Sequence, residues 1–266
     1  RMLQNNEKVN PSKIIGIQFS ILSPEEIKNG SVAEINNRDT YINNKPVIGG
    51  LFDPRMGVLD PGLICPTDGH NFINSPGYFG HIELAKPVFY IQYLSTILKV
   101  LKCVCIKCSK LLIDKEKYSH LLSYNNDNRW NSVYFACSKV KRCGEEIHNG
   151  CGCKQPAKIR KEGLASIIAE WDAVEGIADE EKSKLTIKLI PELILKIFKR
   201  ISDEDVNFMG FSNIWSRPEW FVCQVLGVPP PAVRPSVKHD SQQRSEDDIS
   251  QIIVNIIKAN KTLEEK

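Results

Sequence analysis

Apolar and polar positions alternate near the start of the chain in a way that indicates a strand. Ile15, Ile17 and Phe19 recur at every second position, and this period is typical of a β-strand with one covered face. Ser23-Pro24-Glu25-Glu26 follows and predicts a helix start, with proline at the first helical position and acidic residues in the first turn. Residues 1–12 are largely polar and are expected to be disordered.

Further along, the patterns predict a mixture of helices, short strands and long loops. Residues 45–81 are rich in glycine and proline and should form a looped, multiply turned segment. Residues 86–101 carry apolar side chains at mixed helical spacing. The proline run 228–235 is expected to be extended. A helix is expected over 191–201, where the following residues share one face: Leu193, Ile194, Ile197, Phe198 and Ile201. We therefore expect an α+β fold.

The last predicted helix has an apolar stripe whose partner the pattern does not identify. Ser245-Glu246-Asp247-Asp248 resembles a capping box, and isoleucines follow at helical spacing from Ile249 to Ile257. Such a stripe either docks on the core of the same domain or packs against a second helix, from the same gene or from another chain. The pattern alone favours neither interpretation.

Composition narrows the class of protein. The chain has 266 residues, of which 42% are hydrophobic and 25% are charged; this is ordinary for one large globular domain or two small ones. The net charge of +3 identifies no partner. No apolar run approaches the roughly 20 residues that cross a bilayer, and the first six residues lack the apolar core of a signal peptide. We expect an intracellular protein without a membrane partner.

The cysteines indicate a metal site. Seven of the nine lie between Cys103 and Cys153; their odd number, tight spacing and lack of a secretion signal favour metal ligation over disulfides. Cys105-Ile106-Lys107-Cys108 supplies two thiolates on one turn, which suits two corners of a tetrahedral zinc site. The other two ligands would come from downstream: Cys143 and Cys151, with Cys137 and Cys153 as competitors. A closed set of four ligands would be structural.

Two other interpretations of these cysteines remain open. They could be buried free thiols that pack as small apolar residues. Alternatively, Cys103, Cys105 and Cys108 could form a thiol-redox centre. The redox interpretation is less favoured because the strand–motif–helix setting of such centres, with few other cysteines nearby, is absent.

Positive charge is concentrated around the cysteines. From Lys99 to Lys161 there are 14 basic and 5 acidic residues, a local charge of +9 that leaves −6 for the remainder of the chain. A metal-braced unit with this charge suits a polyanion such as nucleic acid. The alternative is a basic surface that serves solubility alone.

Several longer motifs occur in a fixed order along the chain. They are Asp53-Pro54-Arg55-Met56-Gly57, Ser75-Pro76-Gly77-Tyr78-Phe79-Gly80-His81-Ile82-Glu83-Leu84-Ala85-Lys86-Pro87-Val88-Phe89, Cys105-Ile106-Lys107-Cys108, Gln155-Pro156, Arg160-Lys161-Glu162-Gly163, Gly210-Phe211, Ser216-Arg217-Pro218-Glu219-Trp220, residues 229–236 and Glu246-Asp247-Asp248. In these motifs and their order, the chain resembles the largest subunit of DNA-directed RNA polymerase, of the eukaryotic and large-DNA-virus type, from about Lys13 to residue 266.

The resemblance implies a place in the polymerase clamp, the mobile wall that closes over DNA in the cleft. Residues 13–93 and 221–266 would form the clamp core, and 94–220 an inserted, zinc-braced, mostly helical clamp head. The last helix would be the first half of the clamp's coiled coil. The family's clamp-head zinc ligands correspond to Cys105, Cys108, Cys143 and Cys151, which leaves Cys153 as a spare and Cys137 as structural.

One departure from the family concerns a second zinc site. Its four ligands correspond here to Cys65, Asp68, Ser75 and Tyr78, and the hydroxyls of serine and tyrosine are poor zinc ligands. We expect this site to be lost and the loops at 60–81 to be held by packing alone. A less favoured replacement set is Cys65, Asp68, His70 and His81. The loss, with the isoleucine-rich and lysine-rich composition, points to a divergent lineage such as a viral one.

The second departure concerns catalysis. The family's catalytic motif, N-A-D-F-D-G-D, is absent, and phosphoryl transfer needs metal-bound carboxylates at the reacting phosphates. Glu246-Asp247-Asp248 is interpreted as a helix cap. The chain is therefore expected to belong to a nucleotidyltransferase without being catalytic alone and without binding the catalytic Mg²⁺.

The resemblance also implies a mechanical role, which is to help hold template DNA in the cleft through backbone contacts. Phosphate contacts are expected from Lys139, Lys141, Arg142 and Arg234. The implied partners are other polymerase subunits, DNA and transcription factors on the clamp, in the nucleus or, for a virus, in the virion or host cytoplasm. The alternative is a stand-alone zinc-binding interaction module from a split or truncated polymerase gene.

Overall fold

The computed structural model describes residues 13–163, 165–172, 185–239 and 244–266, so the expectation for residues 1–12 lies outside the described residues. The α-helices are α1 (Pro24–Asn29), α2 (Leu94–Cys103), α3 (Asn126–Cys137), α4 (Pro191–Lys199), α5 (Asp203–Met209) and α6 (Asp248–Glu264). The strands are β1 (Tyr41–Ile42), β2 (Lys45–Pro46), β3 (Gly80–Phe89), β4 (Lys158–Glu162), β5 (Ser166–Trp171), β6 (Leu185–Leu189), β7 (Val222–Val228), β8 (Val237–Lys238) and β9 (Arg244–Ser245). Short 3-10 helices are η1 (Pro54–Met56), η2 (Ile91–Tyr93), η3 (Ser119–Ser123) and η5 (Pro218–Phe221). This mixture confirms the α+β class.

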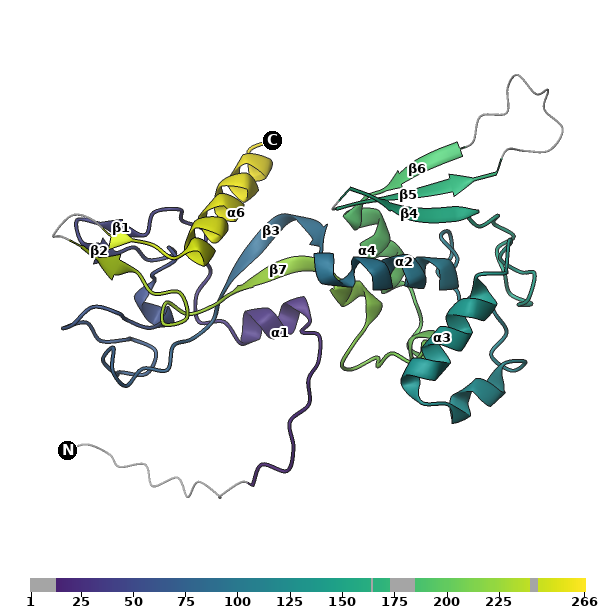
Figure 1. The fold of residues 1–266 in the computed structure, drawn as a ribbon, viewed down its shortest axis with the longest axis horizontal. Helices are drawn as coiled ribbons and strands as arrows, with labels where there is room; N and C mark the ends of the chain where they lie inside the picture. Colours follow the sequence, from purple (N-terminus) through teal and green to yellow (C-terminus); the bar gives the residue numbers. More distant parts are fainter. Residues whose placement is uncertain (1–12, 164, 173–184, 240–243) are drawn as a thin grey trace.

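Strands β3 and β7 pair antiparallel and connect two lobes of the molecule (Figure 1). Gly80 lies opposite Val228, and Phe89 lies opposite Val222. Because these ends of the two strands are neighbours, residues 90–221 form one continuous insertion between β3 and β7, and we call this insertion the excursion. The apolar run 86–101 divides at this point. Its first residues finish β3, and the helical spacing is confirmed for α2 alone.

Each lobe has its own hydrophobic core. The lobe outside the excursion buries residues from the 33–56 loops, from the outer ends of β3 and β7, and from α6: Ala33, Ile35, Leu51, Phe52, Met56, Ile82, Val228, Ile253 and Ile257. The excursion buries a larger set drawn from α2, α3, α4, α5 and β4–β6. The predicted helix at 191–201 is confirmed as α4, which buries Ile194, Leu195, Ile197 and Phe198.

The excursion is less helical than expected. Strands β4, β5 and β6 form a three-stranded antiparallel sheet in that order, and the prediction of a mostly helical segment omitted it. The buried face of this sheet comes from Ile167 and Ala169 on its central strand, with Ile159 and Leu189 on its neighbours. A sheet of this kind depends on pairing between segments that are distant in sequence, which periodicity within a single segment does not reveal.

The strand predicted at Ile15, Ile17 and Phe19 is wrong. Residues 13–23 have no strand assignment, and these three side chains are 98%, 82% and 93% exposed. A strand needs a neighbouring backbone to accept and donate its hydrogen bonds. Before Ser23, which caps α1, this segment makes one backbone hydrogen bond among the described residues, from Ile21 N–H to the Trp215 carbonyl at 3.0 Å.

The proline run is not extended throughout. It turns at 231–234, where the N–H of Val233 donates to the Pro230 carbonyl at 3.0 Å and that of Arg234 donates to the Pro231 carbonyl at 3.1 Å. The φ angle that proline imposes suits the first positions of a β-turn as well as extended backbone. The turn directs Arg234 into the protein.

Helix α6 fits both interpretations of its stripe. Ile253 and Ile257 are buried in the core of its own lobe, whereas Ile249 and Ile252 are 43% and 60% exposed. Asp247 caps the helix by accepting from the Ile249 N–H at 3.0 Å, which confirms the cap but places it two residues after Ser245. In the part of the chain that the structure describes, no helix has the length and apolar character needed to span a membrane.

Arg234 is completely buried, so the expectation that it contacts DNA phosphates is wrong. Its Nε donates to the Pro229 carbonyl at 2.9 Å, its Nη1 to Ser250 Oγ on α6 at 3.3 Å, and its Nη2 to the Leu51 carbonyl. The guanidinium also lies 5.2 Å from the centre of the Phe52 ring. Burial lowers the pKa of Arg234 to about 10, so the side chain is still charged at neutral pH and holds three segments of the lobe together.

We expect Arg234→Met to lower the free energy of unfolding by about 2–4 kcal/mol, because it leaves buried carbonyls at Leu51 and Pro229 without donors. Urea unfolding checks this. Arg38→Met, at a side chain that is 64% exposed, is the matched control and should leave the midpoint unchanged. Equal midpoints for the two variants would contradict this account of Arg234.

Candidate metal centre

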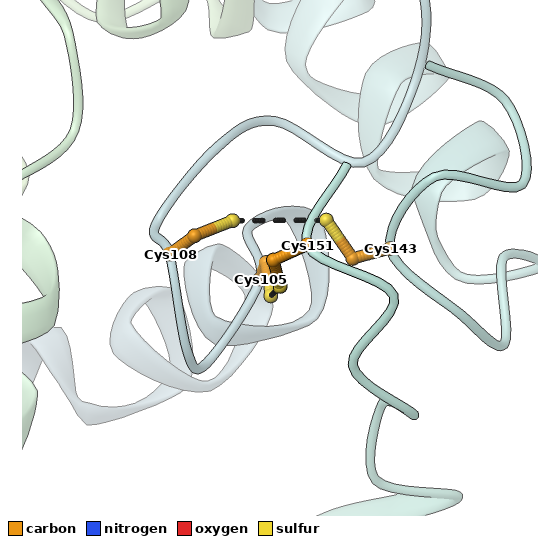
Figure 2. Close-up of side chains that lie close together, drawn as sticks. All are labelled: Cys105, Cys108, Cys143 and Cys151. Carbon is orange, nitrogen blue, oxygen red and sulfur yellow. Dashed lines mark hydrogen bonds between the residues drawn. The ribbon is translucent and has the colours of Figure 1, made fainter. Parts of the chain in front are cut away.

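The first half of the candidate site is a tight turn after α2. The N–H of Cys105 donates to the Lys110 carbonyl at 2.9 Å, and the N–H of Ser109 donates back to the Cys105 carbonyl at 2.8 Å. Ser109 has a φ of +64°, a left-handed conformation that large side chains disfavour. The turn therefore folds back on itself; Cys108 points toward Cys143, and Cys105 lies against Cys151 (Figure 2).

The second half is the loop that carries Cys143 and Cys151. Its base is closed by bonds from the Cys143 N–H to the Cys153 carbonyl and from the Gly152 N–H to the Cys143 carbonyl, both at 2.9 Å. Gly144 and Gly150 touch within the loop, because a Cβ added to Gly150 would lie 2.2 Å from the Gly144 Cα. This contact, which requires glycine at residue 150, allows the two cysteines to approach each other.

The two halves meet so that four sulfurs gather in one place (Figure 2). The ligand atoms of Cys105, Cys108, Cys143 and Cys151 all lie within 4.8 Å of one another. Cys105 Sγ is 3.6 Å from Cys151 Sγ, and Cys108 Sγ is 3.7 Å from Cys143 Sγ. Zn–S bonds of about 2.3 Å in a tetrahedron place sulfurs about 3.8 Å apart. The four side chains could therefore hold one metal ion.

The environment of the sulfurs also suits a cation. Burial raises the pKa of Cys143 to about 12 and also raises that of Cys108. The backbone N–H of Cys153 lowers the pKa of Cys151 to about 7, and Gln155 Nε2 donates to Cys105 Sγ at 3.3 Å. Buried thiolates need a positive partner, and four soft sulfur ligands suit zinc better than magnesium or calcium.

The other cysteines of this region lie outside the four-sulfur group. Cys103 and Cys137 are buried in the core of the excursion, which fits the free-thiol interpretation for these two. Cys153 directs its thiol to the Lys154 carbonyl at 3.5 Å. A redox centre that includes Cys103 is not supported, because burial raises the pKa of Cys103 well above its ordinary value, with Cys137 as its neighbour.

Comparison with known proteins identifies the family. The family described as "RNA polymerase Rpb1, domain 1" matches residues 11–266. This chain belongs to that family. It is 41% identical over 260 residues to the DNA-directed RNA polymerase II subunit RPB1 of Euplotoides octocarinatus, a match that covers 94% of this chain and 54% of the relative. The chain thus spans about half the length of the curated relative that it matches.

The four positions that the resemblance assigns to a second zinc site lie in or beside a hydrogen-bonded cluster around Asp68. The Asp68 carboxylate accepts from the His70 N–H at 2.8 Å, from Ser75 Oγ at 2.8 Å and from Tyr78 OH at 3.1 Å. The thiol of Cys65 is directed to the Arg55 carbonyl at 3.8 Å. The expectation that packing alone holds these loops is therefore wrong, because the side chains of Asp68, Ser75 and Tyr78 bind one another directly.

The less favoured replacement set is not assembled. His81 Nδ1 lies 2.7 Å from Ser31 Oγ, while His70 Nδ1 lies 3.6 Å from Asp68 Oδ1. Among the residues that the structure describes, the four-cysteine group is the one set of histidine, cysteine and acidic side chains close enough to share a metal ion.

The predicted phosphate-contacting residues do not form one group. Lys139, Lys141 and Arg142 are exposed beside the loop 143–151, which we call the metal loop. Lys139 Nζ lies 4.0 Å from the centre of the Phe135 ring. Arg234 lies in the core of the other lobe, as described above. Sequence reasoning also missed Gln155 as a contact of the site. Its position two residues after the last cysteine of the region could have indicated this role.

We expect Cys105→Ser to weaken zinc binding by about 100-fold or more, since losing a group that only hydrogen-bonds to a ligand already costs about 10–100-fold. Its thermal midpoint should fall with the metal content, measured by plasma mass spectrometry and competition with a zinc indicator. Cys153→Ser is the matched control and should keep the metal. Unchanged zinc content and thermal stability in Cys105→Ser would disprove the ligand assignment.

The Asp68 cluster predicts a specific sensitivity to acid. The His70 N–H, followed by the hydroxyls of Ser75 and Tyr78, lowers the pKa of Asp68 from 3.8 to about 2. The ionised carboxylate therefore stabilises the fold above about pH 4, and this stabilisation is lost as the pH falls from about 4 to about 2.

We expect Asp68→Asn to lower the thermal midpoint at about pH 6. On acidification to about pH 2.5, the midpoint of this variant should fall by less than that of the unmodified chain. Calorimetry at both pH values measures the difference. Asp39→Asn, at a carboxylate that is 52% exposed, should behave as the unmodified chain does. Parallel acid profiles for all three proteins would contradict the cluster.

Proposed function

We propose that this chain is the N-terminal clamp segment of the largest subunit of a multisubunit DNA-dependent RNA polymerase. The match of the Rpb1 family to residues 11–266 carries the proposal. In this role the segment is a mechanical part of a nucleotidyltransferase, while the carboxylates that bind the catalytic Mg²⁺ belong to other parts of the enzyme. An intracellular location, in the nucleus or at a viral site of transcription, goes with this role.

The two lobes support a division into clamp core and clamp head. The clamp core would comprise 13–93 and 221–266, and the clamp head would be 94–220. This division agrees with two separate hydrophobic cores and with β3 and β7 as the connection through which the chain enters and leaves the head.

The ion at the four cysteines is proposed to be a single structural Zn²⁺. When bound, it would neutralise the thiolates and cross-link the turn at 105–108 to the loop at 143–151. The four ligands leave no open position, so the ion braces the head and does not act on substrate. The second site of the family is proposed to hold no metal, because the Asp68 carboxylate already accepts hydrogen bonds from the neighbouring positions.

Two exposed apolar features support contact with other parts of a polymerase. Residues 13–20 lie outside the helices and strands and present Ile15, Ile17 and Phe19 to solvent; an exposed apolar segment of this kind fits the edge of another sheet. On α6, Ile249 and Ile252 form an open edge that fits a second helix of a coiled coil. Other polymerase subunits, further clamp segments and transcription factors are the proposed partners.

The proposed contact with DNA lies on the basic side of the head. Lys139, Lys141 and Arg142 are exposed there, within a segment whose local charge is +9. Lysine and arginine side chains that neutralise phosphates bind nucleic acid through charge and shape, with little preference for base sequence.

Affinity purification of the native polypeptide from its source tests the proposal. We expect other polymerase subunits to co-purify in stoichiometric amounts, identified by mass spectrometry, and the intact mass to be several times 30 kDa or to be completed by separate polymerase polypeptides. A polypeptide near 30 kDa that purifies without any polymerase subunit would support a stand-alone zinc-binding module and refute the proposal.

A further inference from the structure

The segments on either side of the metal loop form a short antiparallel ladder. The N–H of Cys143 donates to the Cys153 carbonyl at 2.9 Å, and the N–H of Gln155 donates to the Lys141 carbonyl at 2.8 Å. Arg142 and Lys154 lie opposite each other between these two bonds. At such a position, which has no hydrogen bonds of its own, facing Cα atoms approach to about 4.5 Å and the side chains come closest. Two cationic side chains therefore stand next to each other.

These two cations do not face the sulfurs. Neighbouring residues of an extended segment point to opposite faces. Because Cys143 turns its sulfur to the metal group, Arg142 and Lys154 project from the other face of the ladder. Like charges directly opposite each other destabilise a ladder. Among the ion pairs formed by the described residues, none includes Arg142 or Lys154.

The two side chains border an open cleft of about 450 Å³, together with Lys141, Glu145 and His148. The single carboxylate of this lining is already engaged, since Glu145 Oε2 accepts from the backbone N–H groups of Lys141 at 2.9 Å and Arg142 at 3.2 Å. Arg142 Nη1 donates to the Gly152 carbonyl at 2.9 Å, which fixes the guanidinium at the edge of the cleft. The cleft thus combines a held guanidinium with the facing Lys154 and has room for an anion.

We propose that this cleft holds one phosphate of a nucleic-acid backbone between Arg142 and Lys154. The proposal rests on the DNA contact proposed above and narrows that contact to one site. A guanidinium presents paired N–H donors that match phosphate oxygens, and an ammonium adds a compact charge. Lys154 therefore joins the contacting residues in place of Arg234, and Lys139, whose ammonium lies on the Phe135 ring, is outside the cleft.

The test is binding of the zinc-loaded full chain to a fluorescent duplex of about 20 base pairs, followed by anisotropy over a range of salt concentrations. We expect Arg142→Gln/Lys154→Gln to raise Kd about tenfold and to reduce the slope of log K against log salt by about 1. Lys258→Gln/Lys261→Gln on α6 removes the same charge far from the cleft and should match the unmodified chain. Arg142→Lys/Lys154→Arg keeps both charges and should retain most of the affinity.

The outcomes separate this inference from the broader function. If the unmodified chain binds DNA and the two glutamine variants lose affinity equally, or not at all, the cleft is disproved while the DNA contact stands. Zinc content is measured in parallel. If the cleft variant loses zinc, Arg142 and Lys154 stabilise the metal loop and the inference is overturned. An unmodified chain that does not bind the duplex would refute the DNA contact and the cleft together.

Discussion

The antiparallel pairing of β3 with β7 is the interaction on which the rest of the structure depends. One end of the pair contributes Ile82 and Val228 to one core, and the other end contributes Phe89 and Val222 to the second core. A two-stranded ribbon is only marginally stable by itself, and here packing against a core at each end stabilises it. The register shifts between Glu83 and Val88, midway between the cores, which gives the ribbon a local bend. The orientation of the metal loop relative to α6 is set through this ribbon.

The elements that sequence predicts correctly are those specified by neighbouring residues. Helix α1 has a capping box at Ser23 and Glu26, and α4 shows an apolar face within nine residues; both signals are local. The sheet of β4, β5 and β6 has no comparable signal, because its strands are defined by partners elsewhere in the chain. The false strand at Ile15 illustrates the converse, since alternation specifies a strand's faces but does not provide its neighbour.

The candidate site also combines features that neighbouring residues specify with features that depend on the fold. The spacing of Cys105 and Cys108 indicated half of a metal site, and the family resemblance supplied Cys143 and Cys151. Neither source indicated that Gly144 and Gly150 must touch to bring the second pair together. The burial of Arg234 was equally invisible, because a charged residue in a proline run resembles a surface loop. At Asp68, residue types alone indicated poor zinc ligands, while the hydrogen bonds that replace a metal required the fold.

The order of the residues along the chain has a consequence for synthesis. All four thiols lie between residues 105 and 151, whereas the partner of β3 begins at Val222. A polypeptide emerging from the ribosome therefore exposes a complete set of sulfurs while β3 still has no partner, since domains fold from the N-terminal side as translation proceeds. Closing the short 105–151 loop costs less entropy than closing the longer 80–228 loop. Metal captured during translation would organise the excursion first, and the ribbon would then join it to the other lobe.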